Sequence, residues 1–174
     1  SEAAISTGIE SARLPGRLEW MPGTVDPAVW IDGAHNKDKI LAVTRESIRL
    51  FSGCPPPVIV FGMLRSKDPS PILVELGAAA SSIVLTEPTV HGKESLTADA
   101  LTGAVKASGF QGAIHVEPEP EAAVRCAEAI ARRDGAPVLV IGSMYLAGQV
   151  RRRWFRDQDI VLQRTPWPTV TGER

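Results

Sequence analysis

Val29-Trp30-Ile31-Asp32-Gly33-Ala34-His35-Asn36 is the stretch that decides how this chain folds. Its first three residues are β-branched or aromatic, which favours a strand, and that strand would end at the turn-forming pair Asp32-Gly33. A helical pattern starts at Asn36, a residue type preferred as a helix N-cap. In open α/β sheets, ligands bind beyond the carboxyl ends of strands, where Asp32 and His35 would lie. The alternative is a plain hairpin turn in which Asp32 bonds only to backbone.

The rest of the chain repeats this order of strand and helix. Val58–Phe61 and Pro137–Ile141 are apolar runs without alternation, as is typical of parallel strands buried on both faces. A short run at Leu18–Met21 precedes the first long strand, and we expect these two to form a hairpin. The pattern predicts an α/β fold: a Rossmann-like, mostly parallel sheet of about six strands, with one antiparallel pair and helices on both faces. The expected strands are 18–21, 28–31, 58–61, 82–86, 113–116 and 137–141, and the expected helices are 36–51, 69–80, 97–107, 121–133 and 143–153.

Length and composition fit a single domain over residues 1–174, with a lead-in over 1–14 and a tail over 156–174. The tail contains a strand-like run, Ile160-Val161-Leu162. The chain has 19 basic and 20 acidic residues, a balance that indicates neither a nucleic-acid nor a membrane partner. The two cysteines lie far apart without metal-ligand spacing, so we expect reduced thiols, a cytoplasmic location and no metal site. No apolar run approaches the length of a transmembrane helix.

Polar side chains follow several of the expected strands, so in a parallel sheet they would gather at one edge. Together they predict a polar rim suited to an anionic or zwitterionic ligand. Asp68 and Ser143 also have a structural interpretation, as caps of the helices that follow them. The chain has no G-x-G-x-x-G, no G-x-x-x-x-G-K-[ST] and no G-x-S-x-G, so dinucleotide, phosphate-loop and α/β-hydrolase sites lack support. The members of the rim are Asp32, His35, Lys67, Asp68, Thr86, Glu117 and Ser143.

Four segments resemble one enzyme family. They are Leu14-Pro15-Gly16-Arg17-Leu18-Glu19, Asp32-Gly33-Ala34-His35-Asn36, Phe61-Gly62-Met63-Leu64-Arg65-Ser66-Lys67-Asp68 and Gly142-Ser143-Met144-Tyr145-Leu146-Ala147-Gly148. Their order and spacing resemble those of folylpolyglutamate synthases and their dihydrofolate synthase relatives, which belong to the Mur ligase superfamily. The resemblance covers only the C-terminal domain of that family, so the family's central ATPase domain would lie upstream.

This resemblance implies an ATP-dependent ligase that adds L-glutamate to folate through an acyl phosphate. Tetrahydrofolate polyglutamylation is the implied reaction, with dihydrofolate synthesis as a further one. ATP and Mg²⁺ would be bound mainly by the N-terminal ATPase domain, so the chain alone is expected to be inactive. Its expected partners are that ATPase domain, folate and L-glutamate, and we expect a monomer.

The resemblance also assigns roles to eight residues. Arg17 would reach across the cleft between the two domains towards the nucleotide phosphates. Ser143 would stand at a helix N-terminus, a place suited to a carboxylate. The residues assigned to catalysis are Asp32 and His35. Those assigned to the nucleotide are Arg17, Asp32, His35 and Asn36, and those assigned to the substrate are Lys67, Asp68, Ser143 and Tyr145.

Two features depart from the family's pattern. Lys37 stands where the family usually has proline, and the loop Thr89–Ser95 lacks the arginine-containing pattern expected there. Two other functions stay open: a stand-alone, non-catalytic module that binds nucleotide or glutamate, and a Mur-type peptidoglycan ligase domain. Gly142-Ser143-Met144-Tyr145 favours the folate branch, because the peptidoglycan branch would have a Gly-Lys-Gly-type segment there.

Overall fold

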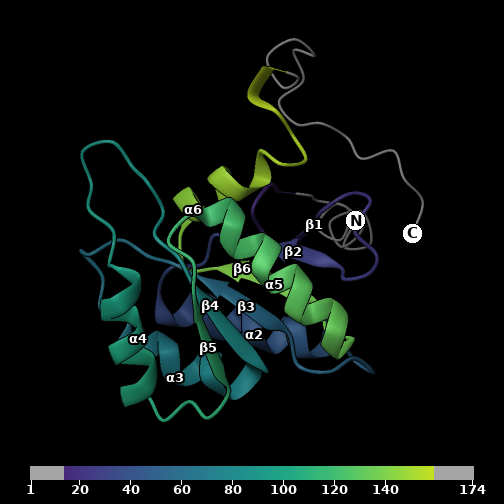
Figure 1. Cartoon of the computed structure of the whole chain (residues 1–174), viewed down its shortest axis with the longest axis horizontal. Helices are drawn as coiled ribbons and strands as arrows, with labels where there is room; N and C mark the ends of the chain where they lie inside the picture. The colour runs from purple at the N-terminus through teal and green to yellow at the C-terminus, as the bar shows by residue number, and fades with distance from the viewer. Residues whose placement is uncertain (1–13, 159–174) are drawn as a thin grey trace, which may run out of the picture.

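The predicted alternation of strands and helices is confirmed by a computed structural model of the chain, which describes residues 14–158 (Figure 1). The predicted lead-in, apart from Leu14, and the tail beyond residue 158, with its strand-like run at 160–162, lie outside the described residues. The elements in chain order are β1 (Glu19–Trp20), β2 (Val29–Ile31), α2 (Lys37–Leu50), β3 (Val58–Phe61), α3 (Ser70–Ala79), β4 (Ser82–Leu85), α4 (Ala98–Ala107), β5 (Ala113–Val116), α5 (Pro120–Asp134), β6 (Val138–Ile141) and α6 (Met144–Arg151).

The described strands form one sheet in the order β1-β2-β6-β3-β4-β5. Every neighbouring pair is parallel except β1 and β2, which form the predicted antiparallel pair. The last strand, β6, lies in the middle: Leu139 pairs with Trp30 on one side and with Ile59 on the other. The carboxyl ends of β2, β6 and β3 therefore lie next to one another, although they are far apart in the sequence.

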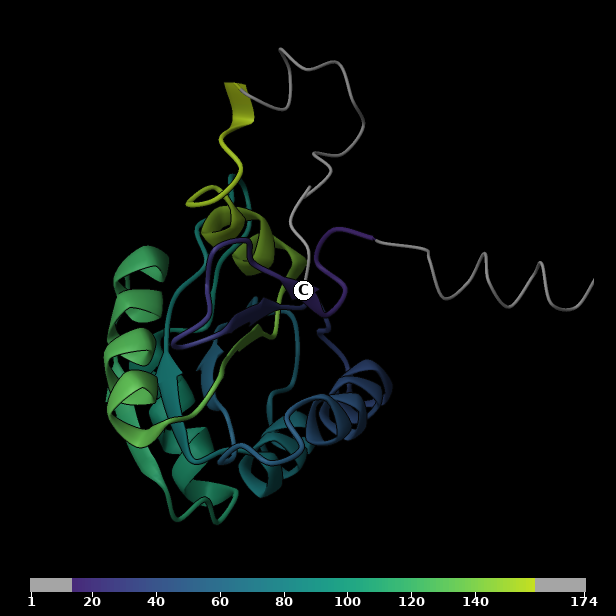
Figure 2. The ribbon, with the colours of Figure 1, turned by 90° about the vertical axis from the view of Figure 1, so that its right-hand side faces the viewer.

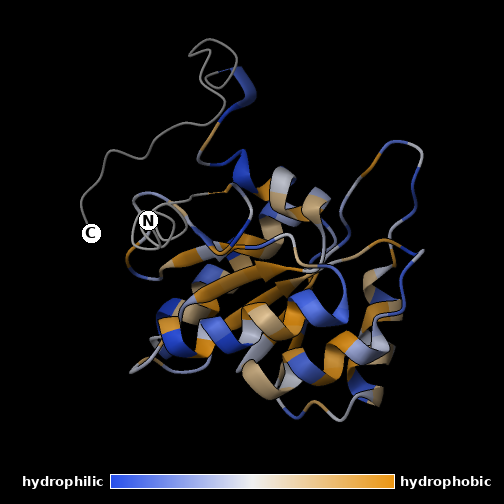
Figure 3. Ribbon diagram, turned by 180° about the vertical axis from the view of Figure 1, so that it is seen from behind, coloured by the Kyte–Doolittle hydropathy of each residue, from blue (hydrophilic) through white to orange (hydrophobic). Residues whose placement is uncertain are grey.

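Helices cover both faces of this sheet, as predicted (Figure 2). On one face, α2, α3 and α4 bury residues such as Ile40, Leu73 and Leu101 against Ile59 and Phe61. The strands are mostly apolar, whereas polar and apolar residues are mixed along the helices (Figure 3). This pattern explains why the central strands lack alternation, since both of their faces are covered.

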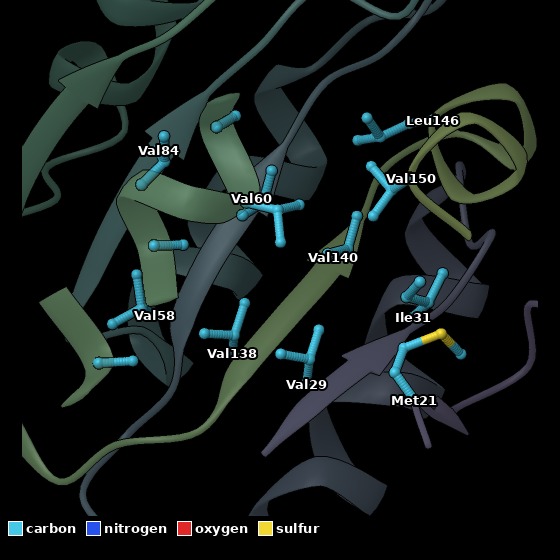
Figure 4. Close-up of a cluster of buried hydrophobic side chains, with 14 of the residues drawn as sticks. Met21, Val29, Ile31, Val58, Val60, Val84, Val138, Val140, Leu146 and Val150 are labelled. Carbon is cyan, nitrogen blue, oxygen red and sulfur yellow. The ribbon is translucent and has the colours of Figure 1, made fainter. Parts of the chain in front are cut away.

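The second core lies between the sheet and the helices α5 and α6. Valines from β2, β3, β4 and β6 point into it, together with Leu146 and Val150 of α6 (Figure 4). The contribution of α5 is a row of small buried residues that includes Ala123, Ala127 and Ala131. Because alanines let a helix approach a sheet closely, α5 packs on the central strands mainly through small side chains, with Val124 and Ile130 as its larger buried residues.

β1 is shorter than the strand predicted over Leu18–Met21. Leu18 has a φ of 38°, so the chain is not extended there. Its N–H donates to Asp32 Oδ2 instead of to a neighbouring strand. The start of the predicted strand therefore belongs to a loop at the candidate site, and β1 pairs Glu19 with Ile31 and Trp20 with Trp30.

The loops that leave β2, β3, β4 and β6 meet at one side of the sheet, which we call the carboxyl edge. Two of these strand ends approach each other very closely. Gly142 has a φ of 116°, and a Cβ atom there would lie 2.7 Å from the carbonyl oxygen of Gly62. Only glycine fits such a position, so Gly142 lets the end of β6 reach the site beside the end of β3.

Candidate functional site

Arg17 lies on a tight loop before β1, here called the Arg17 loop (residues 14–18). Gly16 and Leu18 on either side of it have positive φ angles of 64° and 38°. The carbonyl oxygen of Gly16 accepts a 2.9 Å hydrogen bond from the N–H of Gly33, in the turn after β2. The loop is therefore folded tightly and tied to the turn that follows β2.

Asp32 holds the same loop from the end of β2. Its carboxylate is buried; Oδ2 accepts from the N–H of Leu18 at 2.8 Å, and Oδ1 accepts from the N–H of Ala34 at 2.6 Å. Burial raises the pKa of the Asp32 carboxyl, whereas these hydrogen bonds and the charges of Arg17 and Lys39 act in the opposite direction. Both oxygens thus bond to backbone groups, which gives Asp32 a positioning role towards the Arg17 loop.

A second carboxylate, that of Glu19, supports the loop from the other side. Glu19 Oε2 accepts from the N–H of Gly16 at 2.9 Å and from Arg151 Nε at 2.8 Å. The side chains of this ion pair are only 18% and 10% exposed, and the Arg151 guanidinium also lies 4.0 Å from the ring centroid of Phe155. The sequence pattern does not reveal this ion pair, because the two partners lie 132 residues apart in the chain.

The Arg17 side chain itself is exposed at the carboxyl edge. Its Nη1 donates to the carbonyl oxygen of Gly16 at 3.0 Å and to Met144 Sδ at 2.9 Å. A Cβ atom at Gly33 would lie 1.8 Å from that sulfur, so the glycine leaves room for the contact between Arg17 and Met144. The guanidinium keeps donors available for a phosphate or carboxylate group.

His35 and Asn36 follow in the loop between β2 and α2. His35 Nδ1 lies 2.9 Å from the carbonyl oxygen of Gly33. A carbonyl oxygen only accepts, so Nδ1 is the protonated nitrogen and Nε2 is left to bind a ligand. Asn36 is the predicted N-cap of α2, with its Oδ1 accepting from the N–H of Lys39 at 3.0 Å.

A pocket of about 900 Å³ lies at the carboxyl edge, between the loops that follow β2, β3, β4 and β6. Three basic side chains line it, Arg65, Lys67 and Lys93, against one carboxylate, Glu94. Arg65 Nη1 pairs with Glu94 Oε2 at 2.5 Å, which leaves the charge of the lysines uncompensated by that carboxylate. The full lining is His35, Leu64, Arg65, Ser66, Lys67, Gly92, Lys93, Glu94, Gly142, Ser143, Met144 and Tyr145.

The first helical turn of α6 forms one wall of this pocket. Ser143 is its N-cap, with the hydroxyl oxygen accepting from the N–H of Tyr145 at 3.1 Å. Ser143 is nearly buried, whereas Met144 and Tyr145 are each 41% exposed. A helix N-terminus that opens into a basic pocket favours a carboxylate or phosphate ligand.

Residues 16–144 match the family described as Mur ligase, glutamate ligase domain. The chain belongs to this family. The matched residues make up most of the chain and include Arg17, the turn after β2 and the first residue of α6.

The curated relatives are longer proteins. The probable bifunctional folylpolyglutamate synthase/dihydropteroate synthase of Halobacterium salinarum is 35% identical over 153 residues, which cover 88% of this chain and 18% of that protein. The folylpolyglutamate synthase of Lacticaseibacillus casei is 31% identical over 150 residues, covering 85% of this chain and 31% of the relative. The chain thus spans less than a third of the length of these two relatives.

Solved structures share the fold over nearly the whole chain. A folylpolyglutamate synthase of Mycobacterium tuberculosis, complexed with ADP and AMPPCP, aligns with a TM-score of 0.79 and 25% identity, over 90% of this chain and 36% of that one. FolC of E. coli, in complex with DHPP and ADP, aligns with a TM-score of 0.70 and 26% identity, over 95% of this chain and 36% of that one. The predicted resemblance to folylpolyglutamate synthases, restricted to one domain, is confirmed.

The glutamate ligase domain brings some of the predicted site residues together and leaves others outside the pocket. His35, Lys67, Ser143 and Tyr145 line it. Asp68 does not line it; its Oδ1 accepts from the N–H of Ser70, the capping-type role that the sequence left open. Outside the lining are also Arg17, Asp32 and Asn36, of which Arg17 touches the lining residue Met144.

The sequence missed two of the basic pocket residues. Arg65 lies inside one of the four family-like segments, which is a signal for it. Lys93 lies in the loop Thr89–Ser95, which the sequence marks only by its lack of the family's arginine-containing pattern, and contacts with the distant Gln149 hold this loop in place. No helix within residues 14–158 has both the length and the apolar character needed to cross a bilayer.

Proposed function

We propose that this glutamate ligase domain is the C-terminal, substrate-closing part of an ATP-dependent ligase that adds L-glutamate to folate. The observation that carries this proposal is the basic pocket at the carboxyl edge, which opens onto the N-terminus of α6. The family and the folylpolyglutamate synthase relatives support the class of reaction. Formation of an amide from a carboxyl group and an amine needs positive charge, an oriented amine and exclusion of water.

The pocket would bind the incoming amino acid, L-glutamate. The N-terminus of α6, capped by Ser143, suits the α-carboxylate of L-glutamate. Lys67 adds positive charge to the same pocket, and Tyr145 forms part of its wall. In this arrangement the domain binds and orients the incoming amino acid, while the folate carboxyl group would approach from the partner domain.

The Arg17 loop would contact the nucleotide, ATP. The exposed guanidinium of Arg17 suits the phosphates of ATP, and His35, which lines the pocket at the same edge, offers Nε2 as an acceptor for a nucleotide hydroxyl. Asp32 would affect nucleotide binding indirectly: its carboxylate accepts a hydrogen bond from the N–H of Leu18 and so positions the Arg17 loop. Asn36, at the N-terminus of α2, would complete the nucleotide contacts.

Magnesium would be held elsewhere in the ligase. Within residues 14–158 no group of three or more His, Cys, Asp or Glu side chains lies close enough to hold a metal ion. The guanidinium that Arg17 offers to the nucleotide is cationic, so it suits phosphate and does not suit a metal. An N-terminal ATPase domain would therefore bind Mg²⁺ and most of ATP, with the glutamate ligase domain acting as the closing half of a monomeric, cytoplasmic ligase.

The test of this proposal is amino-acid-dependent ADP release by the full-length protein that contains this domain. We expect release only when ATP, a reduced folate and L-glutamate are all present, and none from chain 1–174 alone, because the latter has no phosphate loop. Release by the isolated, folded chain would contradict the proposal. Tight binding of nucleotide or glutamate by the full-length protein without any turnover would support the non-catalytic binding module instead.

A further inference from the structure

The connection between β4 and α4 forms a hairpin over the pocket, here called the lid hairpin (residues 87–97). It is the teal loop that rises above the sheet in Figure 1. At its base, the N–H of Leu96 donates to the carbonyl oxygen of Met63 at 3.0 Å. Nearer its tip, the backbone of Thr89 exchanges two hydrogen bonds with the side chain of Gln149, at 3.1 and 2.7 Å. The lid hairpin is thus fixed to both the β3 loop and α6.

The side chain of Lys93 extends from the lid hairpin to Tyr145, in the first turn of α6. Its Nζ donates to the phenol oxygen of Tyr145 at 2.5 Å and lies 4.8 Å from the centroid of that ring. A lysine ammonium has three donors, and the phenol takes one of them. The neighbouring carboxylate of Glu94 pairs with Arg65 instead, and in the described part of the chain no carboxylate pairs with Lys93. A positive charge therefore lines the pocket with donors left for a ligand.

Tyr145 also sets the distance from Lys93 to the start of α6. Its backbone N–H bonds to Ser143 Oγ at the helix N-terminus, and its phenol bonds to Lys93. Two places here attract negative charge: the ammonium of Lys93 and the N-terminus of α6. The side chain of Tyr145 lies between them. Both places line the same pocket, and glutamate carries two carboxylates joined by a short aliphatic chain, one for each of them.

We propose that Lys93 binds the side-chain carboxylate of the incoming amino acid and thereby selects glutamate over glutamine. This inference rests on the proposed function, in which the N-terminus of α6 takes the α-carboxylate. A carboxylate accepts charge-assisted hydrogen bonds from an ammonium, and these are about twice as strong as neutral ones. Glutamine places a neutral amide at Lys93, so the ammonium would lose its charged partner in that complex.

The experiment compares Lys93→Met, Lys93→Arg and a control, Lys106→Met, in the full-length ligase. Lys106 is an exposed lysine in the last turn of α4, away from the pocket. We expect Lys93→Met to raise KM for L-glutamate about 10-fold or more, and to reduce the preference for glutamate over glutamine by a similar factor. Lys93→Arg should keep most of that preference, and KM for ATP should change little in any variant.

Three results would overturn this inference. The first is an unchanged KM for glutamate in Lys93→Met, and the second is an equal rise in KM with Lys106→Met. The third is a rise in KM for ATP alone, which would assign Lys93 to nucleotide phosphate. A wild-type ligase without glutamate-dependent ADP release would instead show failure of the proposed function itself, so the two failures are distinguishable.

Discussion

Asp32→Asn is expected to reduce ligation by the full-length enzyme on the order of 10²-fold and to lower the free energy of unfolding by about 1–3 kcal/mol. The reason lies in the two backbone N–H groups, of Leu18 and Ala34, that each bond to a different carboxylate oxygen. An asparagine amide has one acceptor oxygen, and its NH₂ group would face the other N–H. One buried donor would then lose its partner, and the Arg17 loop would shift.

The effect on rate follows from that shift. A displacement of about 1 Å in a positioning group is enough for a 10²-fold loss of rate. The pH dependence gives a second readout. Because burial raises the pKa of Asp32, the native state keeps this proton to a higher pH than the unfolded chain does. The stability due to this group therefore falls as the pH rises from about 3.9, the unfolded value, through the folded pKa.

Steady-state kinetics and denaturant unfolding, measured with Asp38→Asn as the matched control, test this prediction. Asp38 is an exposed residue in the first turn of α2, so its substitution should change the stability by a few tenths of a kcal/mol only, roughly the effect of one helix-dipole charge. Asp32→Asn with wild-type stability and turnover would show that the two hydrogen bonds do not position the Arg17 loop.

Arg17→Lys is expected to leave stability within about 0.5 kcal/mol of the wild type and to lower kcat on the order of 10²-fold. The side chain is exposed, so little folding energy depends on it. A guanidinium binds phosphate with two parallel donors, whereas the ammonium of lysine acts as a point charge on a flexible stem. The loss should therefore appear in turnover and in KM for ATP.

The matched control for this substitution is Arg45→Lys, at an exposed position of α2 with no ion pair among the described residues. Melting curves should be alike for both variants, while only Arg17→Lys should lose turnover. If kcat and KM for ATP stay at wild-type values in Arg17→Lys, the arginine is a turn residue and takes no part in the nucleotide side of the site.

The fold is predictable from sequence here because its strongest signals are local. Val58–Phe61 and Pro137–Ile141 are continuous apolar runs, and short runs of this kind between helical patterns are typical of parallel strands buried on both faces. The strand predicted at Leu18–Met21 is longer than β1 because the conformation of Leu18 depends on Asp32, which is distant in sequence. Local patterns do not contain that kind of information.

The site is predictable only in part, for the same reason. His35 and Ser143 closely follow strands, so a parallel sheet places them at one edge without further knowledge. The pair Glu19–Arg151 and the position of Lys93 depend on side-chain contacts between remote segments. In the sequence, neither the residue type nor the spacing of Glu19, Arg151 and Lys93 distinguishes them from ordinary charged residues of the surface.

The measurement that tests the central claim most directly is the mass of the product formed by the full-length protein from ATP, L-glutamate and a reduced folate. The account predicts a folate whose mass has increased by one glutamyl unit, or by several such units in sequence. An unchanged folate, together with addition of an amino acid to a UDP-muramoyl acceptor under the same conditions, would contradict it and would assign this domain to the peptidoglycan branch of its superfamily.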